Sequence, residues 1–81
     1  MTRDEHVQWV RERAMKEFDY YSKKGGLRDG VRQALASAGS GLRKHPQTVE
    51  QMQPFMMTAL HFRDVINSRQ ELKTFLEAHI R

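Results

Sequence analysis

Apolar residues that recur with helical spacing, segment after segment, are the feature that most limits what this chain can fold into. No segment alternates apolar and polar residues with the period of two that a half-buried strand requires. The spacing is clearest in residues 6–24, where roughly 100° per residue gathers apolar side chains on one helix face. That face consists of Val7, Val10, Ala14, Phe18 and Tyr21. The pattern predicts an all-α protein.

Helix start and stop signals divide the chain into four segments. Gly25-Gly26 supplies the left-handed conformation in which helices commonly end. At three expected helix starts, a Ser or Thr residue is followed three positions later by Glu or Gln, which is the spacing of a capping box. These pairs are Thr2 with Glu5, Thr48 with Gln51, and Ser68 with Glu71. We therefore expect helices over about 3–23, 27–38, 47–66 and 69–80.

These segments predict a single domain of residues 1–81, folded as a compact bundle of three to four helices. The stretch GSGLRKHP, residues 39–46, is expected to be a loop because it combines glycine and serine with a closing proline. Pro54 either kinks the third helix or marks the end of a lead-in turn. Apolar residues spread over a wide arc of this third segment, so we expect that helix at the centre of the bundle.

The composition excludes several classes of protein. Cysteine is absent, so the chain forms no disulfide and offers no thiolate, as suits a reducing cytosol. No run of about 18 apolar residues is present, although a membrane-spanning helix needs one. The N-terminus, MTRDEHVQ, lacks the apolar stretch of a secretory signal. We therefore expect a cytoplasmic protein that does not act at a membrane.

No motif in the sequence indicates catalysis. The four histidines lack the HxxxH and HExxH spacings of zinc sites. No serine lies in the GxSxG turn that exposes a nucleophile. The adjacent Asp4 and Glu5 are explained by a favourable interaction with the dipole at a helix N-terminus. We expect a protein that is not an enzyme, with no catalytic residue, metal ion, cofactor or small-molecule substrate.

An aromatic and cationic stripe lies opposite the apolar face of the first segment. It consists of Trp9, Arg13, Lys16 and Tyr20. Trp, Tyr and Arg are the residue types most enriched at protein interface hot spots. Trp9 could instead cover the edge of a neighbouring helix. Our first hypothesis is that the stripe binds a partner, which makes the chain a small adaptor, inhibitor or regulator that contacts another protein or forms a homodimer.

The net charge of +4 is concentrated in the first half of the chain, where ten basic residues oppose six acidic ones. One basic segment holds Lys23, Lys24, Arg28, Arg32, Arg43 and Lys44, with Asp29 as its only acidic residue. Such a segment favours anionic partners through general electrostatics. The alternative hypothesis is therefore a nucleic-acid-binding protein that uses these six residues, and a plain solvated basic face is the simpler explanation of the same pattern.

The stretch QPFMMTALHF, residues 53–62, offers a rival contact surface. Methionine-rich surfaces adapt to different partners, but a Met and Phe arc on a helix more often forms part of the core. We favour the core interpretation. Met57 lies apart from the main arc and is expected to be exposed.

Overall fold

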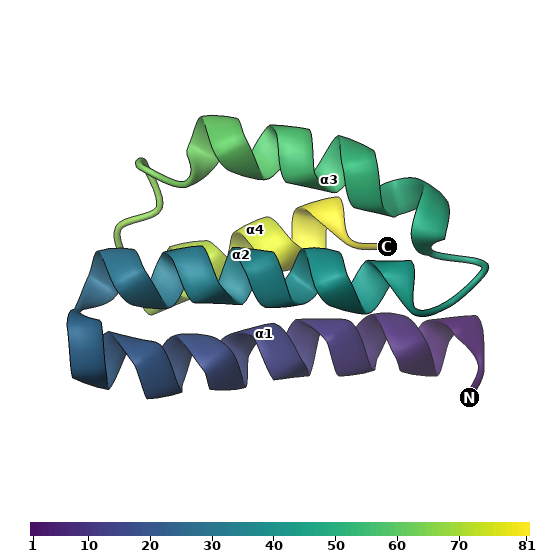
Figure 1. Cartoon of the computed structure of the whole chain (residues 1–81), viewed down its shortest axis with the longest axis horizontal. Helices are drawn as coiled ribbons and strands as arrows, with labels where there is room; N and C mark the ends of the chain where they lie inside the picture. The colour runs from purple at the N-terminus through teal and green to yellow at the C-terminus, as the bar shows by residue number, and fades with distance from the viewer.

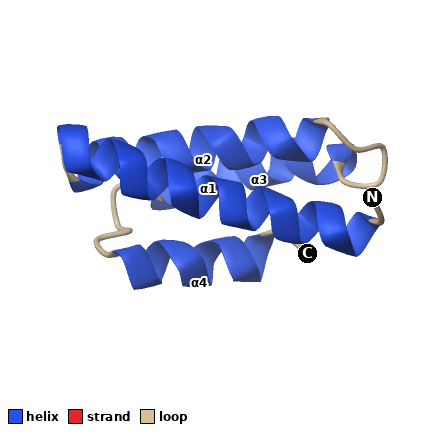
Figure 2. Ribbon diagram, turned by 90° about the horizontal axis from the view of Figure 1, so that it is seen from below, coloured by secondary structure: helices blue, strands red, loops and turns tan.

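The computed structural model describes residues 1–81 and contains four helices and no strand. In chain order they are α1 (Arg3–Gly25), α2 (Leu27–Arg43), α3 (Val49–Phe62) and α4 (Arg69–His79). In Figure 1, α2 lies between α1 and α3, and α4 lies behind them. Seen from below in Figure 2, α2 and α4 lie on opposite sides of the bundle, and both chain ends lie at the same end. The prediction of a compact all-α bundle is confirmed.

The predicted capping box at the start of α1 is present. Thr2 Oγ1 accepts a hydrogen bond from the Glu5 backbone at 3.1 Å, and the Thr2 backbone donates to Glu5 Oε1 at 2.9 Å. At the other end, Gly26 adopts φ +88°, and its N–H donates to Ser22 O at 3.0 Å. This left-handed φ is the conformation that glycine accepts without strain, so the chain reverses here directly into α2.

The predicted loop at residues 39–46 is wrong, because α2 continues to Arg43. Gly39 and Gly41 are buried packing positions of a helix instead of turn residues. A Cβ placed on Gly41 would lie 2.9 Å from Val10 Cγ2 of α1, and one on Gly39 would lie 2.3 Å from Met56 Sδ of α3. The missing side chains therefore leave room for Val10 of α1 and for the Met56 side chain of α3.

The expectation that the third helix lies at the centre is also wrong, because α2 takes that place. Eight residues of α2 are buried, whereas α3 buries only Phe55 and Ala59. The small residues of α2 explain the difference, since they allow close contact along the helix. The buried residues of α2 are Gly30, Val31, Ala34, Leu35, Ala38, Gly39, Gly41 and Leu42.

The start of α3 differs from the predicted capping box. Thr48 caps no backbone N–H of α3, and its buried hydroxyl donates instead to Leu42 O at 2.7 Å, which links the end of α2 to the start of α3. Pro54 lies inside α3, which begins five residues before it, so it does not start the helix. The helix ends at Phe62, short of the predicted 66, and a turn follows.

At the start of α4, Ser68 Oγ accepts a hydrogen bond from the Glu71 backbone at 3.1 Å, as predicted. The Glu71 carboxylate reaches one residue further back and accepts from the Asn67 backbone at 2.7 Å. At the end of α4, Arg11 Nε donates to Ile80 O at 3.0 Å, and Gln51 Nε2 donates to Arg81 O at 2.7 Å. Hydrogen bonds therefore link the last two residues of the chain to both α1 and α3.

The core contains 17 buried apolar residues contributed by all four helices and the segments next to them. Leu42, Leu72, Leu76 and Ile80 are its largest side chains with almost no exposure. None of the four helices has the length and apolar character that crossing a bilayer requires.

Candidate functional site

Trp9, the first residue of the predicted stripe, is half-buried against the core. Its ring lies 5.5 Å from that of the buried His6, whose Nε2 donates to Gly41 O at 2.8 Å. Two cations lie over the Trp9 ring, with Arg13 Cζ 5.3 Å and Lys44 Nζ 5.6 Å from its centroid. Trp9 thus seals the contact between α1 and the end of α2, and its contacts lie within this chain.

Tyr20, at the far end of the stripe, has a different environment. It is 53% exposed, and Lys24 Nζ lies 2.7 Å from its hydroxyl and 4.5 Å from its ring centroid. The 11 positions between Trp9 and Tyr20 separate them by about 16 Å along the helix. The structure therefore places the stripe along one helix face but divides it into a half-buried part at Trp9 and an exposed part at Tyr20. Its role in binding stays a prediction.

The basic segment does not form one patch. Its first four residues lie where α1 meets α2, and Arg43 and Lys44 lie at the opposite end of α2. Arg28 is also occupied within the fold. Its guanidinium donates to the carbonyl oxygens of Arg63 and Ile66 and to Asn67 Oδ1, so it fastens the turn after α3 to the start of α2.

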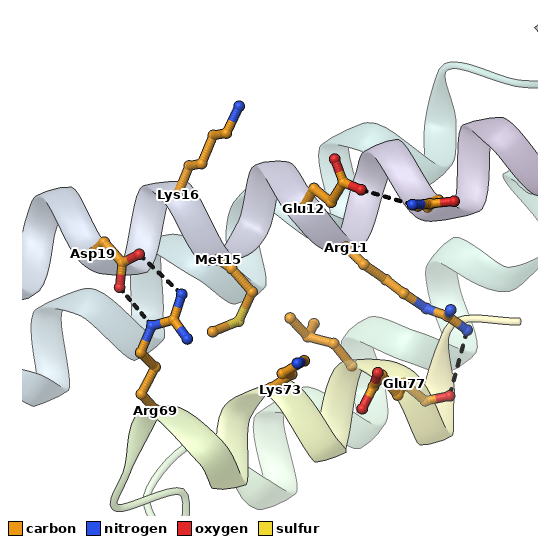
Figure 3. Close-up of a pocket in the computed structure, with 10 residues that line it drawn as sticks. Arg11, Glu12, Met15, Lys16, Asp19, Arg69, Lys73 and Glu77 are labelled. Atoms are coloured by element: carbon orange, nitrogen blue, oxygen red, sulfur yellow. Dashed lines mark hydrogen bonds and ion pairs between the residues drawn. The ribbon is translucent and has the colours of Figure 1, made fainter.

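A charged groove of about 510 Å³ runs between α1 and α4 (Figure 3). Met15 and Leu76 are its only apolar lining residues. Asp19 and Arg69 close one end through two contacts of 2.8 and 3.1 Å, and Lys16 points away from α4. The remaining lining residues are Gln8, Arg11, Glu12, Lys73 and Glu77.

The Arg69 guanidinium hydrogen-bonds to Asp19 and thereby holds the pKa of that carboxyl below its usual value. No group of three or more His, Cys, Asp or Glu side chains lies in a position to hold a metal ion. The groove therefore offers an ion pair that joins two helices, and it holds neither a serine nor a histidine beside its carboxylates.

We predict that Arg69→Gln raises the pKa of Asp19 towards the ordinary value of an aspartate. A carboxyl whose pKa is depressed by folding stabilises the fold above its unfolded pKa, and this contribution is lost as the pH falls through the folded pKa. The difference in stability between wild type and Arg69→Gln should therefore shrink as the solution is acidified. An NMR titration of the Asp19 carboxyl checks the shift, and an unchanged pKa in the variant would contradict the assigned cause.

α3 and the turn after it carry the largest group of exposed apolar side chains, of which Val49, Met57 and Leu60 lie within about 80° of one another on the outer face of the helix. Met57 and Leu60 are 58% and 59% exposed, and Val49 at the start of the helix is 40% exposed. Phe62 and Val65, at the end of α3 and in the turn that follows, are 45% and 59% exposed. The sequence predicts exposure only for Met57 and places the stretch 53–62 mainly in the core. The wide apolar arc was the available signal, because an arc broader than one buried face leaves part of it uncovered.

Two grooves flank this face. The α2–α3 groove, of about 130 Å³, is lined by Arg32, Leu35, Ala36, Met56, Ala59, Leu60 and Arg63. On the other flank, a groove of about 380 Å³ lies between the end of α3 and α4 and includes Phe62, Val65 and Phe75. The Phe62 ring lies 5.8 Å from the Phe75 ring and so closes the core while leaving one of its own faces open.

No protein-family model, curated protein or solved structure matches this chain.

Proposed function

We propose that this protein is a small non-catalytic adaptor, inhibitor or regulator that binds another protein through the outer face of α3. One observation carries the proposal. Seven large apolar side chains are exposed in the whole chain, and five of them lie between residues 49 and 65. Val49, Met57 and Leu60 lie on the outer face of α3, and Phe62 and Val65 lie beside it, on the flank towards α4.

These exposed side chains place apolar surface in contact with water. Isolated exposed apolar residues are ordinary, but a group of them on one element marks a binding surface more often than a solvated one. Leu60 and Met57 belong to α3, the helix with the smallest fraction of buried residues. Neither side chain forms part of the core, so both are free to contact a partner. Methionine adds a flexible side chain that adapts to the shape of a partner.

The nucleic-acid alternative has weaker support. Its six basic residues lie at two ends of α2, and Arg28 already donates to carbonyl oxygens of the fold. If nucleic acid were the partner, the affinity would fall steeply with salt, with a log K slope of about −0.9 per neutralised duplex phosphate.

The test compares one variant in the proposed surface with a matched variant outside it. Leu60→Asp places a charge on the outer face of α3, and Tyr20→Asp places the same charge on an exposed position of α1. Both should fold as wild type, because substitutions at exposed positions usually change stability by about 0.5 kcal/mol or less. Each protein is immobilised, and the proteins that it retains from a lysate of its host are identified with and without nuclease treatment of the lysate. Light scattering measures the mass of each free protein and so detects a second copy of the chain.

We expect a partner, or a second copy of the chain, to be retained by wild type and Tyr20→Asp and lost from Leu60→Asp. If Leu60 is a hot spot, its replacement by a charged residue should weaken binding by about 2 kcal/mol or more. Equal retention by Leu60→Asp would overturn the assigned surface. Loss with Tyr20→Asp alone would assign the contact to the aromatic stripe, and loss after nuclease treatment alone would assign it to nucleic acid.

A further inference from the structure

We infer that the α2–α3 groove receives an amphipathic helix of the partner protein that carries carboxylates at one end. This inference deepens the proposed function and rests on it. The groove has an apolar part and a cationic part, and each limits what could occupy it.

The apolar part is shaped for a helix. Leu35 and Ala59 are buried at its base, and Met56 and Leu60 form the wall on α3. On the α2 side the wall is low, because Ala36 is a small exposed residue. Because the side chain on α2 is small and those on α3 are large, a third helix could pack between these two antiparallel helices, with its ridge of side chains in the groove. No strand is present to offer an edge for an extended peptide, which removes the other common mode of recognition through backbone hydrogen bonds.

The length of the groove sets the size of the contact. Its lining on α3 runs from Met56 to Arg63, over which the chain rises about 10 Å, or about two helical turns. A partner helix would therefore place apolar side chains at positions i, i+3 or i+4, and i+7 on this surface.

The cationic part lies at one end of the groove. Arg32 and Arg63 line the apolar groove and also a second cleft of about 320 Å³ that includes Arg28. Both side chains are exposed, and their guanidinium groups have no salt-bridge or hydrogen-bond partner in the chain. Asp64 is the only acidic residue that lines either cleft. The end of the groove is therefore complementary to carboxylates, which Arg binds in a planar two-pronged geometry.

The experiment uses two fluorescent amphipathic peptides of about 18 residues, long enough to form helix on binding. They share leucines at i, i+4 and i+7, and one carries Glu in its terminal turn where its twin carries Gln. Wild-type protein is compared with Arg32→Glu/Arg63→Glu and with Lys16→Glu/Lys73→Glu. The second pair has the same net charge and lies on α1 and α4, away from the groove. Binding is measured by anisotropy at low salt, and the site is mapped by NMR amide shifts.

We expect the Glu peptide to bind wild type about fivefold tighter than its Gln twin, since two partly exposed charge pairs contribute roughly that much. Arg32→Glu/Arg63→Glu should abolish this preference, whereas Lys16→Glu/Lys73→Glu should keep it. Amide shifts should concentrate on α2 and α3.

Equal affinity of the two peptides for wild type would overturn the inference about charge. Shifts confined to α1 and α4, or no binding by either peptide, would overturn the groove as a helix site. These failures are distinguishable from failure of the proposed function, which is decided by whether Leu60→Asp loses the natural partner. Duplex DNA that binds wild type and loses affinity in Arg32→Glu/Arg63→Glu, with neither peptide bound, would assign the arginines to phosphate.

Discussion

Replacing Leu42 with Ala is expected to unfold a large fraction of the protein at room temperature. Leu42 has no exposed surface, and it lies near the end of the central helix, where its carbonyl also accepts the Thr48 hydroxyl. Truncating a buried leucine costs about 3–5 kcal/mol, because the lost burial is added to the cavity left behind. A core in a chain of this length supplies only about 3–5 kcal/mol of net stability. The two quantities are of the same size, so little stability should remain.

Leu60→Ala is the matched control, because it removes the same atoms from a side chain that is 59% exposed. Its effect should be about 0.5 kcal/mol or less. Urea unfolding followed by circular dichroism measures both variants. Similar midpoints for the two would contradict the assigned burial of Leu42 and exposure of Leu60.

Gly30→Ala is expected to destabilise the fold by about 1–3 kcal/mol, although alanine is the better helix former. A Cβ at this position would lie 2.8 Å from Ser22 Cβ and 3.0 Å from the backbone oxygen of Phe18. The backbone of α1 cannot yield to it without moving the whole helix. The steric loss should therefore exceed the gain in helix propensity of about 1 kcal/mol.

Gly39→Ala tests whether the loss of stability is specific to Gly30 or follows from placing alanine at any buried glycine of α2. A Cβ at Gly39 would meet Met56 Sδ, which belongs to a flexible and half-buried side chain that can turn aside. The gain in helix propensity should then roughly balance the displacement of Met56, and the melting temperature should stay close to wild type. Equal losses in the two variants would show that close approach to α1 is not what requires Gly30.

The apolar periodicity and the start signals near Thr2 and Ser68 were enough to predict an all-α bundle of three to four helices. These signals act within one or two turns of chain, so they are present in the sequence before any tertiary contact forms. The signal at Thr48 failed for a tertiary reason. Its hydroxyl donates to Leu42 O at the end of the preceding helix, a partner that the local pattern does not contain.

The candidate surface was less predictable than the fold. The stretch 53–62 was identified as a possible contact surface, but exposure was expected only at Met57. Whether Leu60 and Phe62 are covered depends on how many neighbours α3 has, and that is decided by packing. Trp9 differs in the opposite direction. Periodicity placed it on the exposed face of the first helix, yet it is half-buried and contacts His6, Arg13 and Lys44.

The sequence by itself determined an all-α chain of four segments, the cap at Thr2, the reversal at Gly26 and the excess of basic residues, because each depends on residue type and local spacing. The tertiary structure decided which helix lies at the centre. In a loop, the glycines at 39 and 41 would supply flexibility, but in α2 they leave room for the Met56 side chain of α3 and for Val10 of α1. α2 buries eight residues and α3 only two, and the exposed apolar side chains on the outer face of α3 form the surface that we propose for partner binding.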